Sequence, residues 1–90
     1  MSKKTTKKRK KNRIKVVYKK LGRSKVWGQC YQGENRIEIE ERLRGKRRFL
    51  VTIHELLHDQ FPDKSESKIR KAETVIGNAL WREDYRKVEN

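Results

Sequence analysis

The chain has 90 residues, of which 42% are charged, and its formal net charge is +14 at pH 7. A chain of this length forms one small domain, near the size at which a hydrophobic core alone gives marginal stability. The single cysteine, Cys30, excludes an internal disulfide framework and fits a reducing cytoplasm. No stretch is apolar enough to predict a membrane span or a signal peptide.

Positive charge is concentrated near the N-terminus. Residues 1–25 contain 13 Lys or Arg and no acid, whereas residues 26–90 contain 13 bases and 12 acids. Residues 2–13 have no apolar side chain, so we expect a disordered basic arm, residues 1–13, followed by one domain, residues 14–90.

The arm favours non-specific contact with the phosphates of nucleic acid, or with an acidic assembly. It has no aromatic side chain that could stack on a base, so sequence-specific reading is not expected. A merely solvated charge run is the alternative. The bases assigned to this contact are Lys3, Lys4, Lys7, Lys8, Arg9, Lys10, Lys11 and Arg13.

Two short segments predict strands. Residues 14–18 are mostly β-branched or aromatic, and residues 36–40 alternate strictly between apolar and charged side chains. Between them, a segment interrupted by three glycines is expected to be irregular. In the second strand, the residues expected to face inward are Ile37 and Ile39, and those expected to face water are Glu38 and Glu40.

Two helices are expected to follow. Apolar residues recur at helical spacing over residues 49–61, which predicts a helix with a buried side that ends near Phe61, because Pro62 disfavours helical backbone in the residue before it. Ser65 is a good N-cap for a second helix from about Glu66 to Tyr85. The apolar stripe of this second helix would comprise Ile69, Ala72, Ile76, Ala79 and Leu80.

The expected fold is α+β. The connection between the helices is only about five residues long, so the second helix should run back along the first, with a short β-hairpin or sheet packed against the pair. This arrangement brings the first turns of the second helix close to the end of the first.

The first helix contains an HExxH motif, His54-Glu55-Leu56-Leu57-His58, which uses both histidines of the chain. Side chains four residues apart lie on one face of a helix, so the two imidazoles can bind the same metal ion. Glu55 is placed to act as a general base on a water molecule rather than as a ligand. The motif therefore predicts Zn²⁺ bound by His54 and His58. The alternative is an amphipathic helix that binds no metal.

The third ligand is left open by the residues themselves. A catalytic zinc usually takes three protein ligands and leaves one position for water, and the chain has no third histidine. Glu66 and Glu73 lie on the second helix, Asp59 and Asp63 flank the turn, and Cys30 is a further candidate. Simpler roles for these acids are capping, solvent contact and, for Glu66, interaction with the helix dipole.

Several segments carry a resemblance to a known group of proteins. They are Gly28-x-Cys30, Arg36-Ile37-Glu38-Ile39, the run from Thr52 to His58, Phe61-Pro62-Asp63-x-Ser65-Glu66 and Ala79-Leu80-Trp81-Arg82-x-x-Tyr85-Arg86. In these segments the chain resembles short HExxH proteins encoded by phages and prophages, which are similar to reduced SprT-like and ImmA/IrrE-like zinc metallopeptidases. The resemblance implies a minimal zincin-like domain in which His54, His58 and Glu66 bind zinc and Glu55 is the base.

Two functional hypotheses follow. The first is a zinc-dependent metallopeptidase of a phage or mobile element, which acts on a peptide or protein in the host cytoplasm. An extended substrate would pair with the edge of the 37–39 strand. No oxyanion-stabilising residue is apparent, and the tyrosines that remain candidates are Tyr18, Tyr31 and Tyr85.

The second hypothesis is a non-catalytic, zinc-stabilised binding or virion-associated protein that contacts nucleic acid or an acidic partner through the arm. A fourth protein ligand, such as Cys30 or a second carboxylate, would favour this hypothesis.

Overall fold

The computed structural model describes residues 13–22, 26–31 and 33–88. The predicted arm lies outside these residues except for Arg13, so its disorder stays a prediction. The described chain forms three strands, β1 (Lys15–Lys19), β2 (Gly28–Tyr31) and β3 (Arg36–Glu40), and two helices, α2 (Gly45–Gln60) and α3 (Glu66–Arg82). The α+β class is thereby confirmed. Neither of these helices is long and apolar enough to cross a membrane.

The three strands form one mixed sheet in the order β1-β3-β2, in which β3 is parallel to β1 and antiparallel to β2. Strand β2 lies in the segment that was expected to be irregular. Its Gly28 is required by close packing, because a Cβ there would lie 2.9 Å from both Glu55 Cγ and Val51 Cγ1 on α2. The idea that a substrate pairs with β3 is wrong, since β3 is the central strand and both of its edges are occupied.

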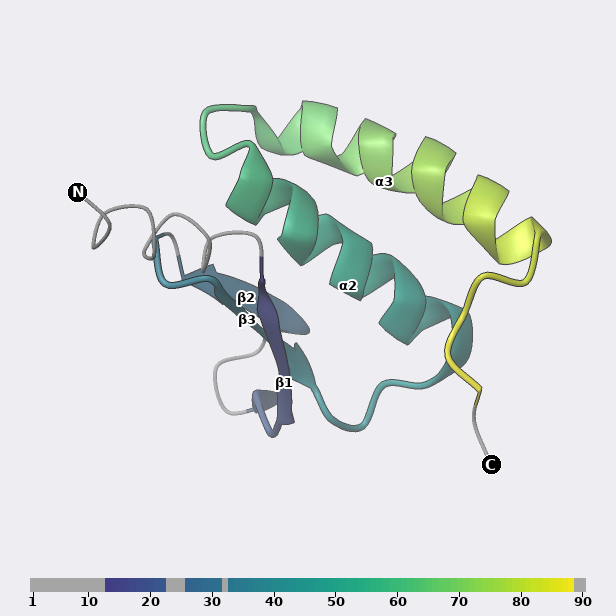
Figure 1. Ribbon diagram of the computed structural model, residues 1–90, viewed down its shortest axis with the longest axis horizontal. Helices are drawn as coiled ribbons and strands as arrows, with labels where there is room; N and C mark the ends of the chain where they lie inside the picture. The colour runs from purple at the N-terminus through teal and green to yellow at the C-terminus, as the bar shows by residue number, and fades with distance from the viewer. Residues whose placement is uncertain (1–12, 23–25, 32, 89–90) are drawn as a thin grey trace, which may run out of the picture.

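Helix α2 lies between the sheet and α3, which runs antiparallel to it (Figure 1). The core between sheet and helix is built on Ile37, Ile39 and Leu43, against which Val51 and Leu56 of α2 pack. The inward orientation predicted for the two isoleucines is thus confirmed. The motif helix itself is less buried than expected: its side chains are only partly covered, because the sheet and α3 enclose it from two sides and leave its flanks open.

The expectation that Glu40 faces water is wrong, because its side chain is 0% exposed. Its carboxylate accepts hydrogen bonds from the Leu21 backbone N–H at 2.7 Å and from Arg42 Nε at 2.8 Å. The predicted alternation is confirmed, since the glutamates of β3 lie on the face opposite the isoleucines. This face is nevertheless covered, because Leu21 and Arg42, which lie outside β3, contact Glu40.

The same correction applies to Glu38, which is 4% exposed. Its carboxylate accepts hydrogen bonds from Gln29 Nε2 and from the Tyr31 hydroxyl, each at 2.9 Å, and the Lys19 ammonium lies 3.7 Å away. These hydrogen bonds lower the pKa of Glu38, led by the bond from Gln29, and outweigh the opposite effect of burial. The Arg36 guanidinium lies over the Tyr31 ring and completes this polar face of the sheet.

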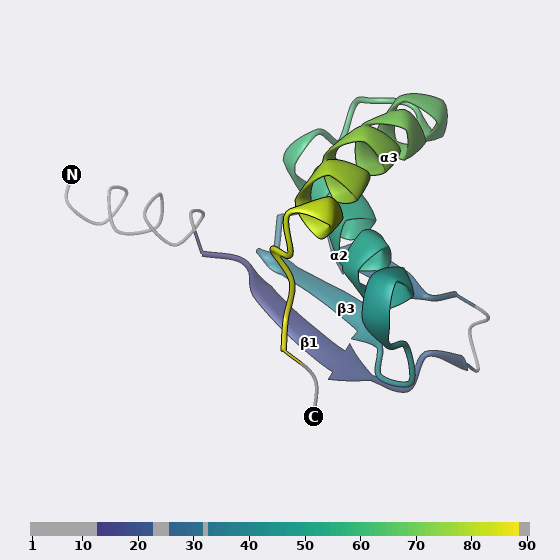
Figure 2. The same ribbon diagram turned by 90° about the vertical axis from the view of Figure 1, so that its right-hand side faces the viewer.

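The buried line of α3 differs in part from the predicted stripe. It passes through Ile69 and Gly77, where the helices pack closely: a Cβ at Gly77 would lie 2.3 Å from Leu50 Cδ2 on α2, so the Leu50 side chain would have to shift. Ile76 and Leu80 are 41% and 37% exposed. The chain leaves the helix at Arg82, three residues before the predicted end, and then turns back toward the sheet (Figure 2).

Glu40 should make the stability of the fold depend on acid pH. The hydrogen bonds from Arg42 and Leu21 lower the pKa of Glu40 from the usual 4.5 to about 2. Because the folded carboxyl binds its proton less tightly than the unfolded one, its contribution to stability is complete above pH 4.5 and is lost as the pH falls from about 4.5 to about 2. Thermal unfolding of Glu40→Gln, followed by circular dichroism, should therefore show a lower Tm at pH 7 and a flatter dependence on pH in this window.

The control for this experiment is Glu41→Gln, at the adjacent exposed position. It should keep the pH dependence of the wild type. An unchanged acid slope in the Glu40→Gln variant would contradict the assigned role of the buried carboxylate.

Candidate metal centre

The geometry of the site begins with the connection between the helices. Helix α2 ends at Gln60 and α3 begins at Glu66, so five residues join them. The Ser65 side chain accepts a hydrogen bond from the Lys68 backbone N–H at 3.2 Å and caps the start of α3, as predicted. The last turn of α2 and the first turn of α3 consequently face each other, which brings His58 and Glu66 together.

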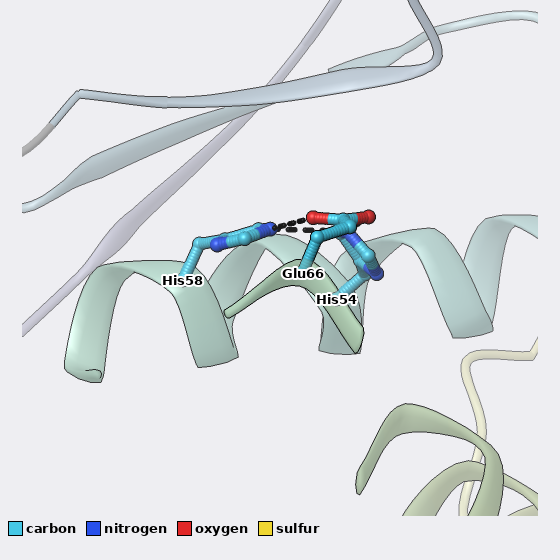
Figure 3. Close-up of side chains that lie close together, drawn as sticks. All are labelled: His54, His58 and Glu66. Carbon is cyan, nitrogen blue, oxygen red and sulfur yellow. Dashed lines mark hydrogen bonds and ion pairs between the residues drawn. The ribbon is translucent and has the colours of Figure 1, made fainter. Parts of the chain in front are cut away.

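Figure 3 shows the imidazoles of His54 and His58, on α2, and the carboxylate of Glu66, on α3, pointing toward one another. His58 Nε2 lies 2.8 Å from Glu66 Oε1, and His54 Nε2 lies 3.2 Å from Glu66 Oε2. The two Nε2 atoms are 3.2 Å apart. One potential ligand atom of each residue lies within 4.8 Å of the other two.

This donor set fits a zinc ion. Two imidazole nitrogens and one carboxylate oxygen are the ligands found in catalytic zinc sites that keep one position for water. The two histidines are partly buried and Glu66 is exposed, so the group is accessible from solvent. The sequence predicted His54 and His58 as ligands and the resemblance implied Glu66; the fold places all three side by side.

Glu73, a candidate third ligand in the sequence, does not belong to the converging group. Its Oε1 lies 2.7 Å from Nδ1 of His54, the ring nitrogen away from the three converging donors. A histidine that binds a metal through one nitrogen commonly donates its other N–H to a carboxylate, which fixes the orientation of the ring. Glu73 therefore holds His54 with Nε2 toward Glu66. The sequence signal was its position seven residues after Glu66, on the helix face shared with Ile69 and Ile76.

Glu55 lies outside the group of three and borders an open hollow of about 440 Å³ beside it. His54, Glu66 and Glu73 line the same hollow, together with Gly28 of β2. Burial raises the pKa of the Glu55 carboxyl, and the nearby histidines oppose this effect. A half-buried carboxylate thus faces the same space as two of the three converging residues, His54 and Glu66.

Arg70 is a member of this hollow that sequence reasoning missed. Its guanidinium donates to Glu66 Oε2 at 2.9 Å, one turn along α3. Burial raises the pKa of Glu66, but the hydrogen bonds from Arg70 and His58 outweigh it, so that the pKa lies below its usual value. The signal for Arg70 was its i,i+4 spacing from Glu66, which places both side chains on one face of a helix.

The other residues considered in the sequence do not join the centre. Cys30 Sγ lies 3.8 Å from Asp59 Oδ1, and neither residue belongs to the group of three. Asp63 is exposed in the connection. None of the three tyrosines lines the hollow: Tyr31 is bound to Glu38 on the far face of the sheet, and the others, Tyr18 and Tyr85, lie elsewhere on the surface.

Comparisons with family models, with curated proteins and with solved structures found no match to this chain. The chemistry of the centre is therefore argued from its own residues.

Proposed function

We propose that the protein is a zinc-dependent metallopeptidase, in keeping with its resemblance to small HExxH proteins of phages and mobile elements. The observation that carries this proposal is the convergence of His54 Nε2, His58 Nε2 and the Glu66 carboxylate beside the half-buried Glu55. Two imidazoles, one carboxylate ligand and a separate carboxylate base are what metal-assisted hydrolysis of a peptide bond requires.

The roles of the residues follow from their positions. His54, His58 and Glu66 would hold the zinc, which supplies a Lewis acid that polarises a peptide carbonyl and acidifies a water molecule. Glu55 accepts a proton from that water as the water oxygen attacks the carbonyl carbon. The same carboxyl then delivers the proton to the amine that leaves when the C–N bond breaks. Glu73 keeps the His54 ring in its binding orientation through the contact at Nδ1.

Because β3 is the central strand, we propose that the substrate pairs with β2 instead. Strand β2 is at an edge of the sheet, and Trp27 and Gly28 line the hollow that Glu55 borders. An extended peptide that pairs with the outer edge of β2, on which the described residues place no other strand, would pass beside Glu55. The Arg70 guanidinium borders the same hollow and supplies positive charge where the carbonyl oxygen becomes negative.

The non-catalytic alternative predicts a fourth protein ligand. Among the described residues, the converging group contains three side chains, and Cys30 is paired with Asp59 instead. Three protein ligands would leave one position for water, as in catalytic zinc sites, which favours the enzyme over a purely structural zinc site.

The Glu55→Gln variant separates metal binding from catalysis. It should bind zinc as the wild type does, because Glu55 is not among the converging donors. It should lose hydrolysis of quenched-fluorescence casein by at least about a hundredfold, since the base is removed. Zinc content by elemental analysis and the rate of fluorescence increase are the two measurements. If zinc is lost from this variant, Glu55 is a ligand and the assigned roles are wrong.

Zinc affinity should distinguish Glu66 from Glu73. In a competition titration with a zinc-binding dye, Glu73→Ala should weaken affinity by about 10–100-fold, as is usual for a residue that orients a ligand. Glu66→Ala removes a donor atom and should weaken it further. Glu83→Ala, an exposed change after the end of α3, is the control and should have no effect. If Glu73→Ala weakens zinc affinity more than Glu66→Ala does, Glu73 is the ligand and the assignment of Glu66 is wrong.

A further inference from the structure

A second recess lies on the opposite flank of α2 from the metal centre. It is an open groove of about 750 Å³, and its lining shares no residue with the hollow beside Glu55. From α2 it is lined by Phe49, Ile53 and Leu56, which are turned away from Glu55 by the helical rotation of about 100° per residue. The groove is therefore a separate feature of the surface.

The walls of the groove are mainly apolar. Leu80 and Trp81 of α3 form one side, and the Trp81 ring packs on Phe49 with the ring centroids 5.4 Å apart. Leu80 is 37% exposed, and Ile76, one turn earlier on the same helix, is 41% exposed. Leu80 lines the groove, and Ile76 extends the exposed apolar surface of α3 beside it.

The rim of the groove is positively charged. Arg48 and Lys87 both lie over the Tyr18 ring, at 5.7 Å and 5.4 Å from its centroid, and Arg86 lies 3.7 Å from the centroid of Trp81. All three cations line the groove with a single acid, Asp84, which is paired with Arg86. The C-terminal segment after α3 runs back toward β1 and carries two of these cations (Figure 2).

We propose that this groove binds an amphipathic helix of an acidic partner protein. The groove follows α2 from Gly45 to Leu56, a length of about 16 Å, which matches three turns of a second helix. Apolar residues spaced at i, i+4 and i+7 would enter the groove, while acidic residues beside them would meet the cationic rim.

The charge of the rim selects this occupant over a second copy. Three cations and one acid line the groove, so two copies that face each other through it would repel, whereas the same rim attracts an acidic partner. Nucleic acid would satisfy the rim but would leave the apolar walls without a matching surface. The proposal does not depend on zinc, because no metal-centre residue lines the groove.

The test uses the full chain and a pool of designed peptides of about sixteen residues, long enough for the groove with one extra turn. Each peptide carries Leu, Ile, Phe or Met on one helical stripe and Glu on the other faces. A second pool has the same charge but Gln on the stripe. Binding is measured by fluorescence polarisation, and the contacted residues by NMR chemical shifts. The apolar pool should bind and shift Tyr18, Phe49 and Leu80, whereas the Gln pool should bind at least about tenfold more weakly.

Matched variants locate the interaction. Leu80→Glu, on the wall, should weaken binding of the apolar pool by about tenfold or more, whereas Val75→Glu, at a 64% exposed position of α3 outside the groove, should not. Lys87→Glu on the rim should weaken binding more than Lys71→Glu, an exposed charge elsewhere on α3.

Three results would overturn the proposal. They are equal binding of the two pools, equal effects of Leu80→Glu and Val75→Glu, and displacement of the apolar pool from Tyr18 and Phe49 by mixed-sequence single-stranded DNA. The last result would make the groove a nucleic-acid surface.

Discussion

The short connection between α2 and α3 is the constraint on which the grouping of His54, His58 and Glu66 depends. Residue 62 is proline and cannot continue α2, and Ser65 caps the next helix after five residues. With so short a connection, α3 must run antiparallel to α2. The first turn of α3 is thereby held against the last turn of α2, and Glu66 meets two imidazoles that are already aligned by their spacing of four residues. A longer or more flexible connection would leave the carboxylate free to move away.

This constraint also divides α2 into two chemically different flanks. On one flank, His54, Glu66 and Glu73 satisfy one another, which avoids the cost of partly buried polar groups without partners. On the other flank, Phe49, Ile53 and Leu56 border an apolar groove with a cationic rim. Because the two linings share no residue, the hydrolysis proposed at one flank and the partner binding proposed at the other can be tested by separate substitutions. A small domain with one central helix can thus present two separate sites.

Local signals in the sequence predicted the parts of this fold that are governed by neighbouring residues. The alternation in residues 36–40, the stop at Pro62 and the cap at Ser65 predicted one strand, the end of α2 and the start of α3, and the HExxH spacing predicted two of the converging side chains. Long-range packing explains what was missed. Strand β2 contains a glycine because α2 packs closely on it, and Glu38 and Glu40 are buried because groups outside β3 bind their carboxylates. The contact of Glu73 with Nδ1 of His54 likewise arises only when the two helices pack together.

X-ray absorption spectroscopy at the zinc edge tests the central claim most directly. The full chain would be loaded with one equivalent of zinc, and its spectrum compared with that of the His54→Ala variant. We expect tightly bound zinc in the wild type with two imidazole ligands, oxygen in the remaining positions and no sulfur, and a loss of imidazole signal and of retained zinc in the variant. A sulfur ligand, or equal retention of zinc by both proteins, would contradict the assignment of His54, His58 and Glu66 as the metal centre.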